Sequence, residues 1–337
     1  PGVRRSGECR RVLADLEHGH LLGLRPRPGL GGHRPVMRGT RRVGQHITAA
    51  LLLATALPVS VGAAVGTRPA TAHAAQAASA SSLSDPNWTP VGQGIAFARV
   101  EAARYCREGS PGIAVVRIDP DRCRIEPYHE REYLGVDPVG VQGWMDRLGA
   151  PVVFNAGLYD EARRHLGMLR RDGTRLESVA HTRWLALLVS GPKAPDLPAA
   201  AILDLGQAAE RAWAEQYRSA VQCMMLFDGQ GEPRVRRSGN VASLTLVAAD
   251  AAGRLLVFVT EGGYTLWESA LLLREAGWGL NRAMALDGGR QASLAVEGGG
   301  VSYRSYARAG ASPSAADILR AATTLPAVVA VRPGRKG

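Results

Sequence analysis

Acidic and amide side chains follow directly after several apolar runs of this sequence. Glu261 comes after the run RLLVFVT, Asp287 after AMAL, and Asn155 after PVVF, with Asp160 on the segment beyond. Two carboxyl groups can together break a C–O bond, because one protonates the leaving oxygen while the other acts as base or nucleophile. Cleavage of a glycosidic bond through an oxocarbenium-like transition state is a reaction that needs both.

The segments around Glu261 and Asp287 predict how these two carboxylates are positioned. Residues 254–260 and 282–286 have the character of strands, and residues 265–276 between them have helical spacing. A strand, a helix and a strand in so short a span predict a βαβ crossover whose two strands are parallel and close. Because ligands bind beyond the carboxyl ends of parallel strands, we expect both carboxylates at one edge of the sheet.

Several candidate residues have a simpler structural explanation beside the functional one. Glu268 projects from the first turn of the predicted helix, near the same strand ends, but Thr265-x-x-Glu268 is also a capping box. Asp287-Gly288-Gly289 fits a tight turn as well as a site. Asn155-Ala156-Gly157 fits a turn in which Gly157 takes a positive φ. Both explanations stay open for each of these residues.

The rest of the chain predicts a single α/β (α+β) domain over residues 88–337. Its central sheet is expected to be mixed and flanked by helices, with the one βαβ crossover near the C-terminus. Runs on either side of Asp119-Pro120-Asp121 predict a hairpin. The segments concerned are the hairpin strands 112–118 and 122–128, the helices 139–148 and 207–220, and the further strands 151–154, 183–190, 223–227 and 244–250.

Residues 37–74 have the three parts of a secretory signal peptide. A basic start with Arg38, Arg41 and Arg42 precedes an apolar run over 47–65, and Ala72-x-Ala74 is a small-residue cleavage pattern. The alternative is a membrane anchor, because the run is about as long as a bilayer requires.

The segments on either side of this leader do not look like folded protein. Residues 1–36 contain no Met and are rich in Arg, Gly and Pro, which fits an upstream extension from a mis-set start. Residues 75–87 form an Ala/Ser linker. We therefore expect a secreted, periplasmic or cell-envelope protein that is cleaved near Ala74 and keeps no stable membrane span.

The formal net charge of +11 comes mostly from the leader. Residues 1–74 contain 11 Arg, no Lys and three acidic residues, whereas residues 75–337 contain 30 basic and 27 acidic residues. A nucleic-acid partner is therefore rejected for the mature chain.

Three cysteines follow the predicted cleavage site. Export favours disulfides, so Cys106 and Cys123 could pair, but three unpaired buried thiols are an equal alternative. The sequence has no CxxC motif or Cys/His cluster, and His165 and His181 have no ligand partner at helical spacing. We expect no cofactor, and the sequence does not settle whether a divalent metal is needed.

Five blocks of the sequence resemble the phosphodiester glycosidase family, in the family's order. They cover roughly Gly112 to Val331, and the match is closer to the exported bacterial branch than to the animal lysosomal enzyme. The blocks are FNAGLYD (154–160), QCMMLFDGQGEPRV (222–235), RSGNVASLTLVAAD (237–250), VFVTEGGYTLWESALLL (257–273) and AMALDGGRQASL (283–294).

The resemblance implies an α/β domain with a pocket that binds a carbohydrate or glycosyl phosphodiester. The sequence departs from the family pattern at Arg290 and Gln291, and at Cys223, where the family usually has serine. The pocket residues implied are Asn155, Gly157, Arg237, Glu268, Asp287 and Gly288, with Ser293 nearby.

These observations predict an exported hydrolase that cleaves sugar-1-phosphodiesters or related anionic cell-envelope or exopolysaccharide linkages. Asp287 and Glu268 are the expected carboxylate pair, with Glu261 as the substitute if Glu268 only caps its helix. Arg237 and Arg290 are expected to neutralise phosphate oxygens. The further substrate-binding candidates are Asn155, Gly157, Asp160, Gly288, Gly289 and Ser293. The alternatives are a non-catalytic glycan-binding protein on the same scaffold and a metal-dependent phosphodiesterase that cuts the P–O bond.

Overall fold

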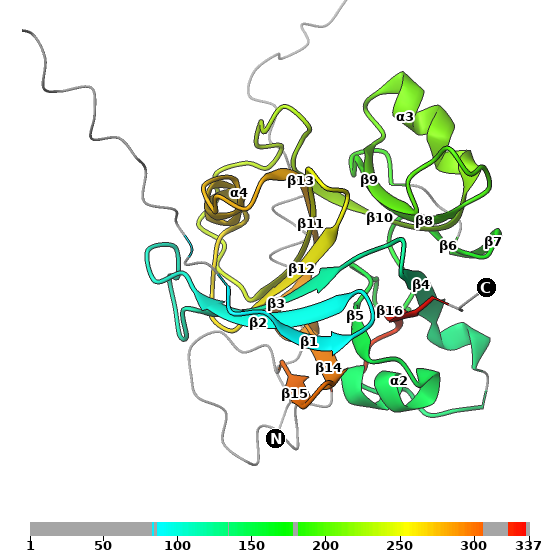
Figure 1. Cartoon of the computed structure of the whole chain (residues 1–337), viewed down its shortest axis with the longest axis horizontal. Helices are drawn as coiled ribbons and strands as arrows, with labels where there is room; N and C mark the ends of the chain where they lie inside the picture. Colours follow the sequence, from blue (N-terminus) through cyan, green and yellow to red (C-terminus); the bar gives the residue numbers. More distant parts are fainter. Residues whose placement is uncertain (1–82, 84–85, 134, 178–180, 306–322, 335–337) are drawn as a thin grey trace, which may run out of the picture. The chain divides into compact units, whose positions relative to one another are not determined.

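The computed structural model describes Leu83 and residues 86–133, 135–177, 181–305 and 323–334 (Figure 1). The predicted extension and signal peptide lie outside these residues, as does most of the predicted linker. None of the helices described is long and apolar enough to span a membrane.

Strands dominate the described part of the chain and form two sheets (Figure 1). The larger sheet has eleven strands in the order β1-β2-β3-β12-β11-β13-β10-β6-β7, with β8 paired to β10 and β9 paired to β8. Its strands are β1 (Thr89–Gly92), β2 (Ile95–Glu101), β3 (Gly112–Ile118), β6 (Leu169–Arg171), β7 (Thr174–Glu177), β8 (Ala186–Pro192), β9 (Ala200–Asp204), β10 (Tyr217–Phe227), β11 (Leu244–Asp250), β12 (Leu255–Thr260) and β13 (Leu280–Gly288).

The smaller sheet has five strands in the order β15-β14-β5-β16-β4. Its strands are β4 (Cys123–His129), β5 (Val152–Asn155), β14 (Leu294–Gly298), β15 (Val301–Arg304) and β16 (Ala327–Pro333). The α-helices of the described residues are α2 (Val141–Leu148), α3 (Ala208–Trp213) and α4 (Leu266–Arg274), and the 3₁₀ turns are Glu130–Glu132, Ala214–Gln216 and Gly289–Gln291.

The predicted mixed sheet is wrong for the described residues, whose strand pairs are all antiparallel. Strands β12 and β13 do run parallel with α4 between them, but β11 lies between the two strands and is antiparallel to both. The short hairpin from β11 to β12 fills the position next to β12, so β13 pairs on the other edge of β11. The described part is therefore predominantly β, with few helices, and fits the α/β class only loosely.

The predicted hairpin of residues 112–118 and 122–128 is also wrong. Both edges of β3 are taken by β2 and β12, whereas β4 pairs with β16 in the smaller sheet. The turn at Asp119 therefore carries the chain from one sheet to the other. Similarly, the helix expected over 207–220 ends at Trp213, because the nearly continuous buried run from Tyr217 pairs as the strand β10.

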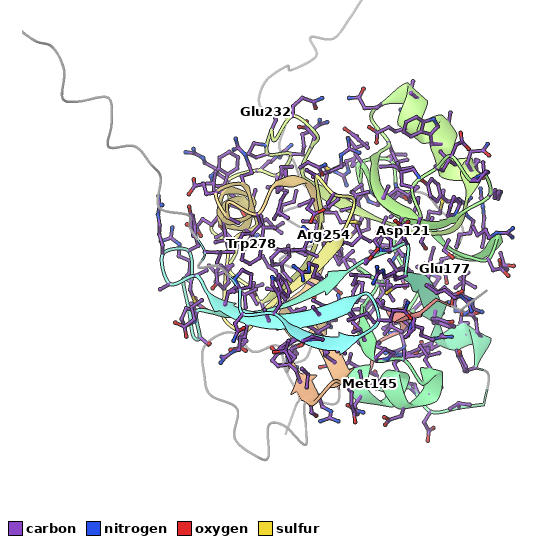
Figure 2. All side chains as sticks on the ribbon, in the orientation of Figure 1. Asp121, Met145, Glu177, Glu232, Arg254 and Trp278 are labelled. Atoms are coloured by element: carbon purple, nitrogen blue, oxygen red, sulfur yellow. The ribbon has the colours of Figure 1, made fainter. Side chains whose placement is uncertain are left out.

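Packing of the smaller sheet explains why the helix predicted over 139–148 forms. The helix α2 buries Val141, Trp144 and Met145 against β5, β14 and β16. Gly149, with φ 56°, takes the left-handed conformation that ends the helix. Figure 2 labels Met145 on α2 and Trp278, whose indole stacks on Phe258 with ring centroids 5.9 Å apart. Strand β4 in turn packs against β8 and β10 of the larger sheet.

Candidate active site

The ends of β12 and β13, which lead to Glu261 and carry Asp287, lie on the same side of the larger sheet as the start of β11. β12 ends at Thr260 and β13 at Gly288, and the first residue of β11, Leu244, lies between them. Leu244 pairs with Gly288, and its N–H donates to Thr260 Oγ1 at 2.9 Å. The arrangement follows from β12 and β13 running parallel on either side of β11.

Asp287 belongs to β13 rather than to a tight turn, and its carboxyl group is buried. Its side chain accepts a hydrogen bond from the N–H of Gly288 at 2.7 Å on Oδ1. Burial raises the pKa of Asp287 to about 7, outweighing the opposite effect of this backbone bond. A carboxyl group that titrates near neutral pH is suited to general acid or base catalysis.

The glycines after Asp287 bring the backbone close to the start of β11. The N–H of Gly289 donates to the carbonyl of Ser243 at 2.8 Å. A Cβ on Gly288 would lie 2.9 Å from the same carbonyl oxygen, so a larger residue there would push the two segments apart. Gly289 has φ +64°, which favours glycine, and starts the 3₁₀ turn that leads to Ser293.

Asn155 ends β5 in the smaller sheet and is fixed by two hydrogen bonds. Its Oδ1 accepts from Thr245 Oγ1 at 2.7 Å and from the N–H of Ser293 at 3.1 Å. Since Thr245 follows the residue paired with Gly288, the Asn155 amide lies near the strand end that bears Asp287. The buried Nδ2 of Asn155 has no hydrogen-bond partner among the described residues. A buried donor of this kind is available for a ligand or a water molecule.

Gly157 lies in a buried cluster with two residues that the sequence left without a role in the site. Its φ is 146°, and a Cβ there would lie 2.9 Å from His165 Nε2 and 3.7 Å from Cys223 Sγ. Burial lowers the pKa of His165 to about 4, so the imidazole is neutral at neutral pH. Burial, with a contribution from the charge of Asp287, raises the pKa of Cys223 to about 12. The Cys223 thiol is therefore protonated, and His165 and Cys223 line the cluster as neutral groups.

Two further substrate-binding candidates, Asp160 and Arg290, have no hydrogen bond or ion pair with Asp287 or Asn155 among the described residues. Asp160 accepts from Arg164 Nε at 2.8 Å and from the Arg164 N–H at 2.9 Å. Burial alone would raise the pKa of Asp160, but these bonds and the charge of Arg164 hold it below the usual value. Arg290 is exposed on the 3₁₀ turn after β13.

Glu268 is both a capping residue and part of a cavity wall. Its backbone N–H donates to Thr265 Oγ1 at 3.1 Å, and Thr265 Oγ1 donates to its carboxylate at 2.9 Å. Arg107 also binds both carboxylate oxygens, with Nε donating to Oε2 at 3.0 Å and Nη2 donating to Oε1. The bonds from Arg107, followed by those from Thr265, hold the pKa of Glu268 below its usual value. Glu268 is therefore ionised at neutral pH.

Glu261 is held by partners from three other segments. Arg99 Nε donates to Oε1 at 2.7 Å, Ser110 Oγ donates to Oε2 at 3.0 Å, and the Tyr303 hydroxyl lies 3.3 Å from Oε1. Burial alone would raise the pKa of Glu261, but these contacts hold it below the usual value. Its contacts fasten β2 and β15 to the end of β12.

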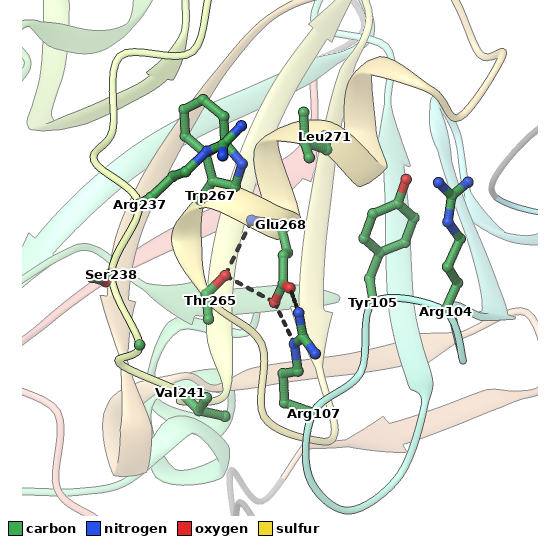
Figure 3. A pocket seen from close by; sticks show the side chains of 11 residues that line it. Arg104, Tyr105, Arg107, Arg237, Ser238, Val241, Thr265, Trp267, Glu268 and Leu271 are labelled. Atoms are coloured by element: carbon green, nitrogen blue, oxygen red, sulfur yellow. Dashed lines mark hydrogen bonds and ion pairs between the residues drawn. The ribbon is translucent and has the colours of Figure 1, made fainter.

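A cavity of about 690 Å³ opens beside the first turn of α4 (Figure 3). Its wall combines arginines, aromatic rings and one carboxylate. The lining residues are Arg104, Tyr105, Arg107, Arg237, Ser238, Gly239, Val241, Thr265, Trp267, Glu268 and Leu271. Figure 3 shows Arg237 over Trp267, with the guanidinium carbon 4.6 Å from the ring centroid. The excess of arginines over carboxylates suits an anionic ligand.

Asp287 does not line this cavity, although one chain segment connects the two places. The cavity wall includes Arg237, Ser238, Gly239 and Val241, and Ser243, two residues further along the chain, accepts from the N–H of Gly289. The first residues of this segment thus line the cavity, and its last residue contacts the end of β13. The structure therefore groups Asp287 with Asn155, Gly157, Gly288 and Ser293, and groups Glu268 with Arg237.

Sequence reasoning missed the loop before β3, which supplies Arg104, Tyr105 and Arg107 to the cavity. A run such as EAARYCREGS has no periodicity that would place these residues near α4. Of the two alternatives for the cysteines, the unpaired one is confirmed, since Cys106, Cys123 and Cys223 are all free thiols, although Cys106 is only partly buried. Among the described residues, no group of three or more His, Cys, Asp or Glu side chains is arranged to hold a metal ion.

Comparison with known proteins shows the family of the chain. No curated protein matches the sequence. One similar solved structure is the zebrafish N-acetylglucosamine-1-phosphodiester alpha-N-acetylglucosaminidase catalytic domain auto-inhibited by its pro-peptide. The two share 14% sequence identity and a TM-score of 0.51, over 72% of this chain and 87% of that one. At this identity the likeness concerns the fold.

A hypothetical protein from Synechocystis has a TM-score of 0.47 and 14% identity, over 72% of this chain and 63% of the other. The chain thus spans less than two thirds of the length of that protein. The sequence profile of the phosphodiester glycosidase family matches residues 149–321, which is more than half of the chain. This protein therefore belongs to the phosphodiester glycosidase family.

Proposed function

We propose that this protein is a hydrolase that cleaves the glycosidic bond of sugar-1-phosphodiesters or of related anionic cell-envelope linkages. The observation that carries the proposal is the contrast between Asp287 and Glu268. The pKa of Asp287 is raised to about 7 by burial, whereas Arg107 holds that of Glu268 below its usual value. A glycosidase needs one carboxyl group that keeps its proton and one that is ionised, and opposite pKa shifts supply both.

In this proposal the substrate reaches from the cavity, which Glu268 lines, to the end of β13, where Asp287 protonates the bridging oxygen as the bond between the anomeric carbon and that oxygen breaks. Glu268, as the ionised partner, stabilises the positive charge that develops on the sugar or attacks the anomeric carbon. Water then adds its hydroxyl group to the anomeric carbon and returns a proton to Asp287. Glu261 is the substitute for Glu268, although its bonds to Arg99, Ser110 and Tyr303 leave it less free.

The remaining candidates would bind the substrate around these carboxyl groups. Arg237 would neutralise the phosphate from the cavity wall, where a guanidinium can bind two phosphate oxygens at once. The free Nδ2 of Asn155 would donate to a sugar hydroxyl. Gly157, Gly288 and Gly289 would allow close approach of the sugar, with Ser293, Arg290 and Asp160 at the margins.

The proposal includes export, which rests on the three-part leader of residues 37–74. N-terminal sequencing of the mature protein should begin at or near Ala75. A protein that keeps Met37 and sediments with membranes would instead support the anchor.

Product analysis on a panel of sugar-1-phosphodiesters in ¹⁸O-labelled water tests the proposed reaction. We expect a free sugar that carries the label and an unlabelled phosphate monoester. Label in the phosphate, with release of a sugar phosphate, would show a phosphodiesterase. Saturable binding without turnover would show a glycan-binding protein.

A further inference from the structure

The segment before β3 is fastened to the residues that lead into α4. The N–H of Arg107 donates to the Gly263 carbonyl at 2.8 Å, and the N–H of Gly263 donates to the Glu108 carbonyl at 2.8 Å. A Cβ on Gly262 would lie 2.4 Å from the Glu108 carbonyl oxygen, so only glycine permits this approach. The backbone of Arg107 is therefore fixed relative to the first turn of α4, because Gly263 precedes Glu268 by only a few residues.

Arg107 uses only part of its guanidinium on Glu268. The ion pair involves Nε and Nη2, which leaves both N–H groups of Nη1 outside the contact. The Arg107 side chain lines the cavity and is more than half exposed, whereas that of Glu268 is mostly covered. Figure 3 shows the two side chains meeting at the cavity wall. An anion in the cavity can thus reach the guanidinium without displacing the carboxylate.

We propose that Arg107 determines the specificity of this site for anionic substrates by binding the substrate phosphate while it holds Glu268 ionised. The inference rests on the proposed function and adds a residue outside the segment that matches the family profile, which begins at residue 149. A phosphate on Nη1 shares the positive charge with Glu268 and weakens the bonds that restrain the carboxylate. A neutral glycoside leaves those bonds intact. The carboxylate is therefore more nucleophilic when the substrate carries a phosphate.

Arg104→Ala is a matched control, because Arg104 lines the same cavity and its replacement removes the same positive charge. Its guanidinium lies 3.5 Å from Glu275 and has no contact with Glu268 among the described residues. The other groups near Glu268 are Thr265 from its own helix start and Tyr105 from the cavity wall, whereas Arg237 lines the same cavity with its guanidinium over Trp267. These stay in place in both variants.

The test compares the wild type with Arg107→Ala, Arg107→Lys and Arg104→Ala by two measurements. The first is the dependence of kcat/KM on pH for a sugar-1-phosphodiester and a neutral aryl glycoside. Arg107→Ala should lower the preference for the phosphodiester about tenfold or more. It should also move the acid limb of the profile to higher pH, because Glu268 loses the bonds that keep its pKa low. Arg107→Lys should restore part of both effects, and Arg104→Ala should leave the acid limb in place.

The second measurement follows the Glu268 side-chain carboxyl carbon by NMR in ¹³C-glutamate-labelled protein, assigned with Glu268→Gln. Added inorganic phosphate should shift this signal in the wild type and in Arg104→Ala, but not in Arg107→Ala. The inference is overturned if Arg107→Ala and Arg104→Ala have the same acid limb in the kcat/KM profile and the same phosphate-induced shift of the Glu268 signal. If none of the proteins turns over the phosphodiester but phosphate still shifts the Glu268 signal only when Arg107 is present, the proposed reaction is rejected. The binding of phosphate by Arg107 would then still be supported.

Discussion

The hydroxyl group of Thr245 donates a hydrogen bond of 2.7 Å to the side-chain oxygen of Asn155, and this bond joins the two sheets at the candidate site. Thr245 lies on β11 of the larger sheet and Asn155 ends β5 of the smaller one. Both side chains are almost completely buried. The N–H of Ser293, which can only donate, identifies the same atom as the amide oxygen, so the nitrogen is left for a ligand.

Thr245→Val should therefore affect both stability and activity. The substitution preserves the shape of the side chain but leaves Asn155 Oδ1 with only the N–H of Ser293, which should lower the free energy of unfolding by about 1–3 kcal/mol. Turnover should fall as well, because the Asn155 amide loses one of the two hydrogen bonds that hold it in place. Urea unfolding and kcat/KM measure the two effects.

Ser190→Ala is the matched control for Thr245→Val. The Ser190 hydroxyl donates to the carbonyl of Ile125, so it also joins the two sheets, but it lies on β8 rather than at the candidate site. We expect a comparable loss of stability with unchanged kcat/KM. Equal losses of activity in the two variants would show that Thr245 acts only through stability.

The pKa of Asp287 predicts a dependence of stability on pH. It is raised from a usual value of 3.8 to about 7, so between these values the folded chain holds a proton that the unfolded chain has released. The contribution of this group to the free energy of unfolding is therefore fully present below about pH 3.8. It is lost as the pH rises from there through about 7. The loss is on the order of a few kcal/mol, since one pKa unit corresponds to about 1.4 kcal/mol.

Asp287→Asn stays neutral and should not show this loss. The free energy of unfolding of the variant minus that of the wild type should therefore be larger at about pH 8 than at about pH 5. The increase should be on the order of a few kcal/mol. Urea unfolding of both proteins at the two pH values measures the difference. The same difference at both pH values would mean that Asp287 titrates in the usual range.

Arg237→Ala tests the contribution of the cavity to binding of the phosphate. Loss of a charge-assisted contact costs about 1.5–3 kcal/mol, or roughly 10- to 100-fold in kcat/KM for a phosphodiester. A neutral aryl glycoside, if it is cleaved at all, should lose much less. The neighbouring Arg236 is exposed and does not line the cavity, so Arg236→Ala should match the wild type on both substrates. Equal losses in the two variants would assign the effect to net charge.

Local patterns predicted several of the elements that carry the candidate site. The strand over residues 244–250 and the helix that starts after Thr265 are present with nearly the predicted bounds, because hydrophobic runs and a capping box are local signals. Asp287 also follows a buried run, as predicted, but the strand extends through Gly288. The close backbone contact with Ser243 keeps the segment extended where the sequence also allowed a tight turn.

Contacts between distant segments could not be predicted in this way. Gln222 heads one of the recognised blocks, and its buried side chain accepts from the N–H groups of Met168 and His181 and donates to the carbonyls of His181 and Trp184. Nothing near Gln222 in the sequence indicates these partners. The same holds for Arg107, which lies far from Glu268 in the chain. Strand order was missed for a similar reason, since periodicity gives a strand but not its neighbour.

Turnover of a sugar-1-phosphodiester by Asp287→Asn is the most direct test of the proposed catalytic role. Asparagine keeps the size of the side chain and does not open a cavity, so the variant should fold. It cannot give up a proton as a general acid, so kcat/KM should fall about 10²- to 10⁴-fold, for phosphodiesters and neutral glycosides alike. A variant that is folded and turns over the phosphodiester at the wild-type rate would contradict the account.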